Sequence, residues 1–353
     1  MDASTPTPTT SAAESAADRG EDAAHAPAVH GQPTEPDAAR QSIIAAFVRL
    51  ARPKQWAKSV FVLIGPLYGL MDHAMPLGQA LAPALWAALG FALLASACYA
   101  VNDVVDAPKD RLHPRKRLRP VASGRIAPTA AYAFSGAMAL AGCVALVLTG
   151  SARWIVLCLG LLYAANVMAY SFSLKRRVIA DVMSLSFGFV LRVLAGCAAA
   201  SVSPSTWLLN CTLFLAMFLA FGKRLGERRT VGAAAASVRG VQAIYTDELL
   251  RMMTLVTGVV TLLTYAGYVQ SRDESFSVAI FGAGTGAGAH APGLNVLWFT
   301  LIPVTYALLR AIVLLERGKY DDPTEMATRD WPLQVAVAAF GAITVLSVML
   351  THG

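Results

Sequence analysis

Long apolar segments recur from about residue 47 to the end of the chain, and short polar segments rich in Lys and Arg separate them. A membrane-crossing helix needs roughly 17–25 such residues. Lipid offers no hydrogen-bond partner to free backbone groups, so each segment must be helical. The pattern predicts an all-α, polytopic membrane protein with nine transmembrane helices, at residues 57–71, 80–101, 128–149, 152–171, 181–200, 205–222, 249–270, 294–316 and 331–350.

Residues 1–40 have a different composition, rich in Pro, Ala, Thr and acidic groups and nearly free of large apolar side chains. Such a segment buries too little surface to offset the entropy of ordering, and it is expected to be a disordered tail. It has no basic region followed by an apolar stretch, so it does not resemble a signal peptide. Residues 41–353 are expected to form the transmembrane domain.

The distribution of positive charge predicts the orientation of the helices. With a cytoplasmic N-terminus, nineteen Lys and Arg residues fall in or beside the cytoplasmic loops, and only Arg153 and Arg272 fall on the opposite side. This bias is typical of a multi-pass protein of the plasma membrane whose polar loops face the cytoplasm. The net charge of +7 is then explained by topology and lipid attraction, and nucleic acid is not an expected partner.

Composition excludes two other classes. Of the 353 residues, 56% are hydrophobic and only 14% are charged, too few for a soluble protein of this size. Five cysteines, none in a CxxC pair, exclude a disulfide scaffold and give no support to a zinc or redox site.

The end of the second predicted span carries four side chains with oxygen ligands. Asn102, Asp106 and Asp110 are four residues apart and share one helical face, with Asp103 beside them. Hard oxygen ligands suit Mg²⁺, which shares its coordination with water and substrate phosphates. The alternative is an interfacial acidic patch that neighbouring arginines neutralise.

Cations follow directly in the sequence. Arg111, Arg117 and Arg119 are candidates for binding a diphosphate opposite the metal, although an ordinary positive-inside loop would look similar. In the loop after the sixth span, Glu227 is a candidate second metal carboxylate, with Lys223 and Arg224 as phosphate contacts. The alternative is a simple ion pair between positions i and i+4.

Further polar side chains lie at or inside the predicted spans. Asp181 and Arg192 are eleven residues apart in the fifth span, nearly on one face, where ionisable groups are costly and point to function. A structural pairing is the alternative, and Arg310 in the eighth span raises the same question. The remaining candidate substrate contacts, near the cytoplasmic interface, are Lys54, Gln55, Lys58, Tyr170, Lys175 and Arg177.

The segment NDVVDAPKD (102–110) resembles the NDxxDxxxD motif of the UbiA superfamily of intramembrane prenyltransferases. The resemblance implies a nine-helix bundle with a metal–diphosphate site that faces the cytoplasm, where Asp103, Asp106 and Asp110 are catalytic. The superfamily's second motif, DxxxD, is replaced here by KRLGE. With RPKQWAKSVFV, YSFSLKRRVIADVMSLSFGFVLRVLAG, FGKRLGERR and DDPTEM, the chain resembles a phosphoribosyl-transferring branch of the superfamily over about residues 45–350.

This branch implies Mg²⁺-dependent transfer of 5-phosphoribosyl from phosphoribosyl diphosphate to decaprenyl (polyprenyl) phosphate, with release of pyrophosphate, toward a precursor of cell-wall arabinan. One alternative is a prenyltransferase that moves a prenyl group from a prenyl diphosphate to an aromatic or quinone-precursor acceptor. A transporter or lipid-binding scaffold is the other, but the polar groups cluster at one face rather than at mid-depth. Membrane lipids are expected partners, and assembly into a homo-oligomer is left open.

Overall fold

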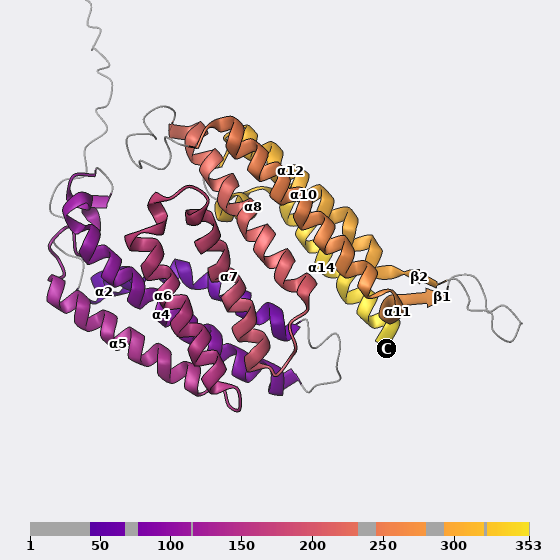
Figure 1. Ribbon diagram of the computed structural model, residues 1–353, viewed down its shortest axis with the longest axis horizontal. Coiled ribbons are helices and arrows are strands. Elements are labelled where there is room, and N and C mark those ends of the chain that lie inside the picture. Colours follow the sequence, from indigo (N-terminus) through magenta and orange to yellow (C-terminus); the bar gives the residue numbers. More distant parts are fainter. Residues whose placement is uncertain are drawn as a thin grey trace, which may run out of the picture. The chain divides into compact units, whose positions relative to one another are not determined.

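The computed structural model describes residues 43–67, 77–113, 116–231, 245–279, 293–320 and 323–352. These residues are almost entirely helical, as predicted, and the elements are labelled in Figure 1. The predicted disordered tail, residues 1–40, lies outside the described residues.

Eight helices in the described part of the chain are long and apolar enough to cross a membrane, and they match the second to ninth predicted spans. They comprise α4 (Leu77–Arg111), α5 (Pro128–Val147), α6 (Arg153–Phe172), α7 (Ala180–Ala199), α8 (Thr206–Val231), α10 (Asp247–Ser271), α12 (Leu301–Glu316) with the preceding η6 (Val296–Thr300), and α14 (Trp331–His352). The chain is thus a multi-pass membrane protein. A short hairpin of β1 (Ser277–Ala279) and β2 (Gly293–Asn295) follows α11 (Asp273–Phe276), and α13 (Pro323–Arg329) precedes α14.

The first predicted span has a different structure, so the count of nine is not confirmed. After α2 (Ile43–Ala51), residues Pro53–Leu63 form a 3₁₀ helix, η1, which residues 64–67 continue as one α-helical turn. The rest of that predicted span, 68–71, lies outside the described residues. A 3₁₀ helix rises about 2.0 Å per residue, so the eleven residues of η1 extend roughly 22 Å.

Every third side chain of η1 faces the neighbouring helices α4 and α7. Trp56 donates a hydrogen bond to the Ser96 hydroxyl of α4 at 2.9 Å, and Val62 is fully buried. A Cβ atom at Gly196 of α7 would overlap the Val62 carbonyl oxygen, and Gly65 approaches Cys197 in the same way. Small residues at these crossings allow the backbones to touch, which is the usual means of close packing in membranes.

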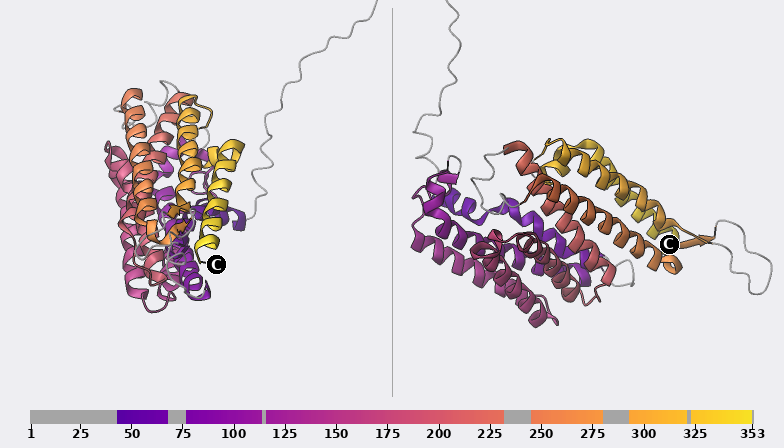
Figure 2. Two further views of the ribbon diagram at one scale, coloured as in Figure 1. Left: turned by 90° about the vertical axis from the view of Figure 1, so that its right-hand side faces the viewer. Right: turned by 45° about the horizontal axis from the view of Figure 1, so that its top comes forward.

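The helices pack in two groups (Figures 1 and 2). In the amino-terminal group, α4 contacts α5, α6 and α7, and η1 lies against α4 and α7. In the carboxyl-terminal group, α10 packs on α8 and α12, and α12 packs on α14; α7 and α8 join the two groups. Each group has its own buried apolar cluster, around Phe91 and Tyr163 in the first and around Phe218 and Leu314 in the second.

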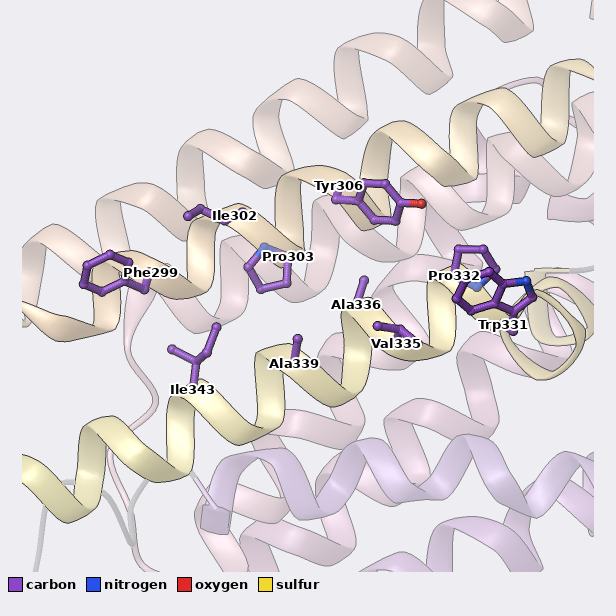
Figure 3. A pocket seen from close by; sticks show the side chains of 10 residues that line it. All are labelled: Phe299, Ile302, Pro303, Tyr306, Trp331, Pro332, Val335, Ala336, Ala339 and Ile343. Atoms are coloured by element: carbon purple, nitrogen blue, oxygen red, sulfur yellow. The ribbon is translucent and has the colours of Figure 1, made fainter.

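An apolar cavity of about 440 Å³ lies between α12 and α14 (Figure 3). Its walls are aliphatic and aromatic side chains, including Ile302, Tyr306, Trp331 and Ile343. None of the described side chains that line it is charged.

Candidate active site

The last turns of α4 form one wall of a polar cavity of about 810 Å³. Asn102, Asp106 and Asp110 line it together, as their spacing of four residues predicts, because α4 stays helical through Pro108. The other walls come from η1, the segment after α4, α6, η3 (Leu174–Arg176) and α7. The lining residues with polar or aromatic side chains are Arg52, Lys58, Tyr99, Asn102, Asp106, Lys109, Asp110, His113, Lys116, Arg119, Tyr163, Asn166, Tyr170, Ser171, Lys175, Arg176, Ser184, Phe189 and Arg192.

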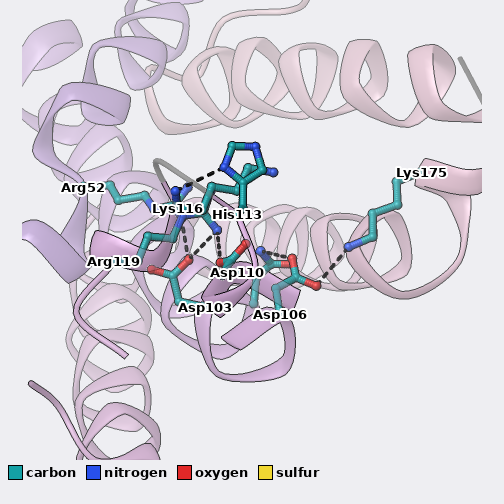
Figure 4. Close-up of polar contacts among 9 residues, drawn as sticks. Arg52, Asp103, Asp106, Asp110, His113, Lys116, Arg119 and Lys175 are labelled. Atoms are coloured by element: carbon teal, nitrogen blue, oxygen red, sulfur yellow. Dashed lines mark hydrogen bonds and ion pairs between the residues drawn. The ribbon is translucent and has the colours of Figure 1, made fainter. Parts of the chain in front are cut away.

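The two carboxylates at the outer end of the cavity contact cations from distant parts of the chain (Figure 4). Lys175 Nζ lies 3.5 Å from Asp106 Oδ1, and Arg119 Nη1 lies 2.7 Å from Asp110 Oδ2. The Asn102 amide donates to Asp106 Oδ2 at 3.0 Å. Cations and carboxylates therefore meet at one place, as a site for a metal-bound diphosphate requires.

Asp103 lies beside this wall and does not line the cavity. It is only 2% exposed and accepts hydrogen bonds from Arg52 and Arg119 (Figure 4). Arg52 has a left-handed backbone, with φ of 53°, and its guanidinium lies 4.9 Å from the centre of the Tyr99 ring. A strained backbone persists only where surrounding contacts stabilise it. Here the contacts of the Arg52 side chain with Asp103 and Tyr99 stabilise its conformation beside the cavity.

The inner end of the cavity carries a buried arginine. Arg192 of α7 is 5% exposed and donates to the Gly188 carbonyl at 2.9 Å and to the Tyr163 hydroxyl at 2.7 Å. Its guanidinium carbon lies 4.4 Å from the centre of the Tyr163 ring and 5.3 Å from that of Phe189. All these partners are neutral.

A second polar cluster adjoins the cavity through Tyr170. Arg224 of α8 contacts Asp181 at 3.3 Å, Glu227 at 3.2 Å and the Tyr170 hydroxyl at 3.4 Å. Tyr245, just before α10, donates to Asp181 Oδ1 and accepts the Ile179 N–H, both at 2.7 Å. Burial and the hydrogen bond to Asp181 raise the pKa of the Tyr245 hydroxyl above its usual range, so it acts as a donor at any physiological pH.

The predicted site residues fall into four sets. Eight of them line the cavity: Lys58, Asn102, Asp106, Asp110, Arg119, Tyr170, Lys175 and Arg192. Asp181, Arg224 and Glu227 belong to the adjoining cluster, and Asp103 lies behind the wall. The cavity walls do not include Lys54, Gln55, Arg111, Arg117, Arg177 or Lys223; Arg111 donates to the Ala122 carbonyl instead, at 3.3 Å.

Several residues that line the cavity are not among the candidates that the sequence provides. Arg52 and Lys116 belong to dense runs of cations, where sequence gives no reason to favour one member. Tyr163 and Asn166 lie inside a predicted span, and their helical spacing with Tyr170 was the available signal.

The oxygen donors on α4 are of the kind that Mg²⁺ prefers. Asn102, Asp106 and Asp110 offer hard amide and carboxylate oxygens on one helical face that opens to the cavity. No group of three or more His, Cys, Asp or Glu side chains within the described ranges could hold a metal alone. Two carboxylates and one amide suit an ion that takes its remaining ligands from water and substrate phosphates, as Mg²⁺ usually does.

A polar cavity whose walls combine carboxylates with Lys and Arg thus lies inside a bundle of membrane helices. Residues 62–333 match the UbiA prenyltransferase family, and the chain belongs to that family.

Curated relatives match nearly the whole chain. The decaprenyl-phosphate phosphoribosyltransferase of Mycobacterium tuberculosis strain H37Rv is 31% identical over 317 residues, which cover 87% of this chain and 94% of the relative. The enzyme of the same name from Mycolicibacterium smegmatis is 30% identical, over 85% of this chain and 91% of its own length.

Solved structures share the fold. A UbiA homologue from Archaeoglobus fulgidus bound to DMAPP and Mg²⁺ superposes with a TM-score of 0.60 at 15% identity, over 86% of this chain and 99% of that one. The same homologue bound to GPP and Mg²⁺ gives a TM-score of 0.57.

Proposed function

We propose that this protein transfers a 5-phosphoribosyl group from phosphoribosyl diphosphate to a polyprenyl phosphate, such as decaprenyl phosphate, and releases pyrophosphate. The product would be a lipid-linked pentose precursor for cell-wall arabinan. The site would face the cytoplasm from the plasma membrane, in line with the charge of the loops. The names of the mycobacterial relatives support the activity.

The charge of the cavity carries this proposal. Its described walls hold eight Lys and Arg side chains and only two carboxylates. Phosphoribosyl diphosphate brings two anionic groups, and the lipid phosphate brings a third. A prenyl diphosphate with a neutral acceptor brings one anionic group and calls for fewer cations than these walls hold.

Asn102, Asp106 and Asp110 are the residues that would hold Mg²⁺. When bound, the ion would neutralise charge on the diphosphate as it leaves. Arg119 and Lys175, which contact Asp110 and Asp106, are placed to bind diphosphate oxygens beside it. In place of a direct catalytic role, Asp103 would position Arg52 and Arg119.

In the reaction, an oxygen of the lipid phosphate forms a bond to ribose C1, and the bond from C1 to the pyrophosphate oxygen breaks. The bonding electrons leave with pyrophosphate, and C1 gains oxocarbenium character in the transition state. A phosphate monoester is largely ionised at neutral pH, so no general base has to remove a proton from the acceptor. The cavity contributes positioning and fixed positive charge.

The direct test is an assay of the purified protein in lipid nanodiscs with phosphoribosyl diphosphate labelled in the ribose. We expect the label to enter the lipid phase, with equimolar pyrophosphate, only when both polyprenyl phosphate and Mg²⁺ are present. Parallel reactions with a labelled prenyl diphosphate and an aromatic acceptor are the control. Transfer in the control but not in the main reaction would overturn the proposal in favour of a prenyltransferase.

A further inference from the structure

Arg192, at the inner end of the cavity, is a buried guanidinium that has no counter-ion among the described residues. It lies eleven residues along α7 from Asp181, about 17 Å at 1.5 Å per residue, inside a membrane-spanning helix. Among the described residues, no carboxylate lies within 4 Å of it, and its Nε has no hydrogen-bond partner. Burying a cation costs free energy unless an anion pairs with it.

Space for an anion exists beside this guanidinium. Gly188 lines the cavity one helical turn before Arg192 and has no side chain to fill the space between α6 and α7. A Cβ atom at Gly188 would lie 3.6 Å from Arg192 Nη1 and 3.7 Å from the Asn166 amide nitrogen. The Tyr163 ring would be nearer still, at 3.5 Å, so these are ordinary contact distances. Arg192 Nη1 and the Asn166 amide, which already donate to the Gly188 and Ser184 carbonyls, both line the cavity at this point.

The cavity is thus positive at both ends. Tyr99 and Asp110 line its inner and outer parts, and they are eleven residues, or about 17 Å, apart on α4. Lys116, Arg119 and Lys175 supply the outer charge, and Arg192 supplies the inner charge behind the Tyr163 and Phe189 rings.

We propose that Arg192 binds a phosphate monoester at the inner end of the cavity, namely the 5-phosphate of the donor, and thereby selects a donor that is anionic at both ends. This inference rests on the proposed function. The two anionic groups of phosphoribosyl diphosphate are attached to C1 and C5, on opposite sides of the ribose ring. A prenyl diphosphate is charged at one end, and its apolar tail would leave the buried guanidinium without an anion.

Product-like inhibitors separate the two ends experimentally. Ribose 5-phosphate carries only the inner group, and pyrophosphate carries only the outer one. In Arg192→Met, we expect the KM for phosphoribosyl diphosphate and the Ki for ribose 5-phosphate to rise about tenfold or more, the usual effect of losing a charge-assisted hydrogen bond. The Ki for pyrophosphate and the KM for the polyprenyl phosphate should stay within about twofold, a split that general loss of structure would not produce.

Gly188→Ala is a second variant, which keeps the charge and places a methyl group beside Arg192, Asn166 and Tyr163 at ordinary contact distances. It should weaken the binding of ribose 5-phosphate more than that of pyrophosphate. It therefore tests the same site if Arg192→Met does not fold. Arg251→Met removes an exposed arginine that pairs with Glu316, and it should change none of these constants.

Three outcomes would overturn the inference. An unchanged Ki for ribose 5-phosphate would remove Arg192 from the binding site. An equal rise for both inhibitors would show a general effect on the cavity. A rise in the lipid KM alone would assign the inner site to the acceptor phosphate. All three require that the wild-type protein turns over phosphoribosyl diphosphate; if it does not, the proposed function fails together with this inference.

Discussion

Arg192 and Arg310 are both arginines within membrane-spanning helices, and the sequence alone gives no reason to treat them differently. Arg310 of α12 forms two hydrogen bonds with Asp330, of 3.2 and 3.0 Å, and Asp330 also accepts the Leu333 N–H at the start of α14. Arg192 has only neutral partners and lines the polar cavity. An internal carboxylate completes the first arrangement, whereas the second is complete only with a ligand.

The largest expected effect distinguishes Asp106, a carboxylate that lines the cavity, from Asp330, a carboxylate that pairs with Arg310. Asp106→Asn should lower kcat/KM for transfer at least about 100-fold, because it removes a charged ligand from the proposed metal site, with little change in Tm. Asp330→Asn, the matched control, should lower Tm and leave transfer by the folded protein unchanged. A wild-type rate in Asp106→Asn would end the assignment of that carboxylate to the metal.

The next effect concerns the two arginines themselves. Arg310→Met leaves Asp330 buried without its cation, so it should lower Tm more than Arg251→Met does, while the donor KM stays unchanged. Thermal unfolding in nanodiscs and steady-state kinetics measure both. A donor KM that rises as it does in Arg192→Met would contradict the distinction drawn here.

A smaller effect is expected at the cluster that adjoins the cavity. Tyr245→Phe removes the hydroxyl that joins Asp181 to the Ile179 N–H and takes a hydrogen bond from the buried Asp181 carboxylate, at a cost of about 1–3 kcal/mol of unfolding free energy. Unfolding measurements on Tyr132→Phe, at an exposed position of α5, supply the control. Equal stability of the two variants would show that the Tyr245 hydroxyl contributes nothing.

The smallest effect is a dependence on pH. The hydrogen bond from Arg310 lowers the pKa of Asp330 below its usual value of about 3.9. The stabilisation is therefore complete above that value and is lost as the pH falls through the lower, folded-state pKa. Tm measured from pH 7 downward should fall less steeply below pH 4 in Asp330→Asn than in the wild type, and identical slopes would rule out this contribution.

Sequence periodicity anticipated the elements that follow simple rules. Hydropathy located eight spans, because lipid requires long apolar helices. Spacing by four residues placed Asn102, Asp106 and Asp110 on one wall, because α4 continues as a regular helix to Arg111.

Residues whose role depends on a distant partner could not be placed from the sequence. Asp330 lies twenty residues from Arg310, and Tyr245 lies 64 residues from Asp181; each pair meets only through helix packing. The choice of Arg119 over Arg117 for the cavity likewise depends on the fold of the segment after α4, which cation spacing does not reveal.

The winding of η1 determines which changes of length this segment can accept. At about three residues and 6 Å per turn, Trp56, Ser59 and Val62 form a single row along it. Deleting one residue would rotate everything beyond the deletion by about 120° and turn Val62 away from Gly196. Deleting three would keep the row aligned and shorten it by a turn, so related chains should differ in length here only by multiples of three.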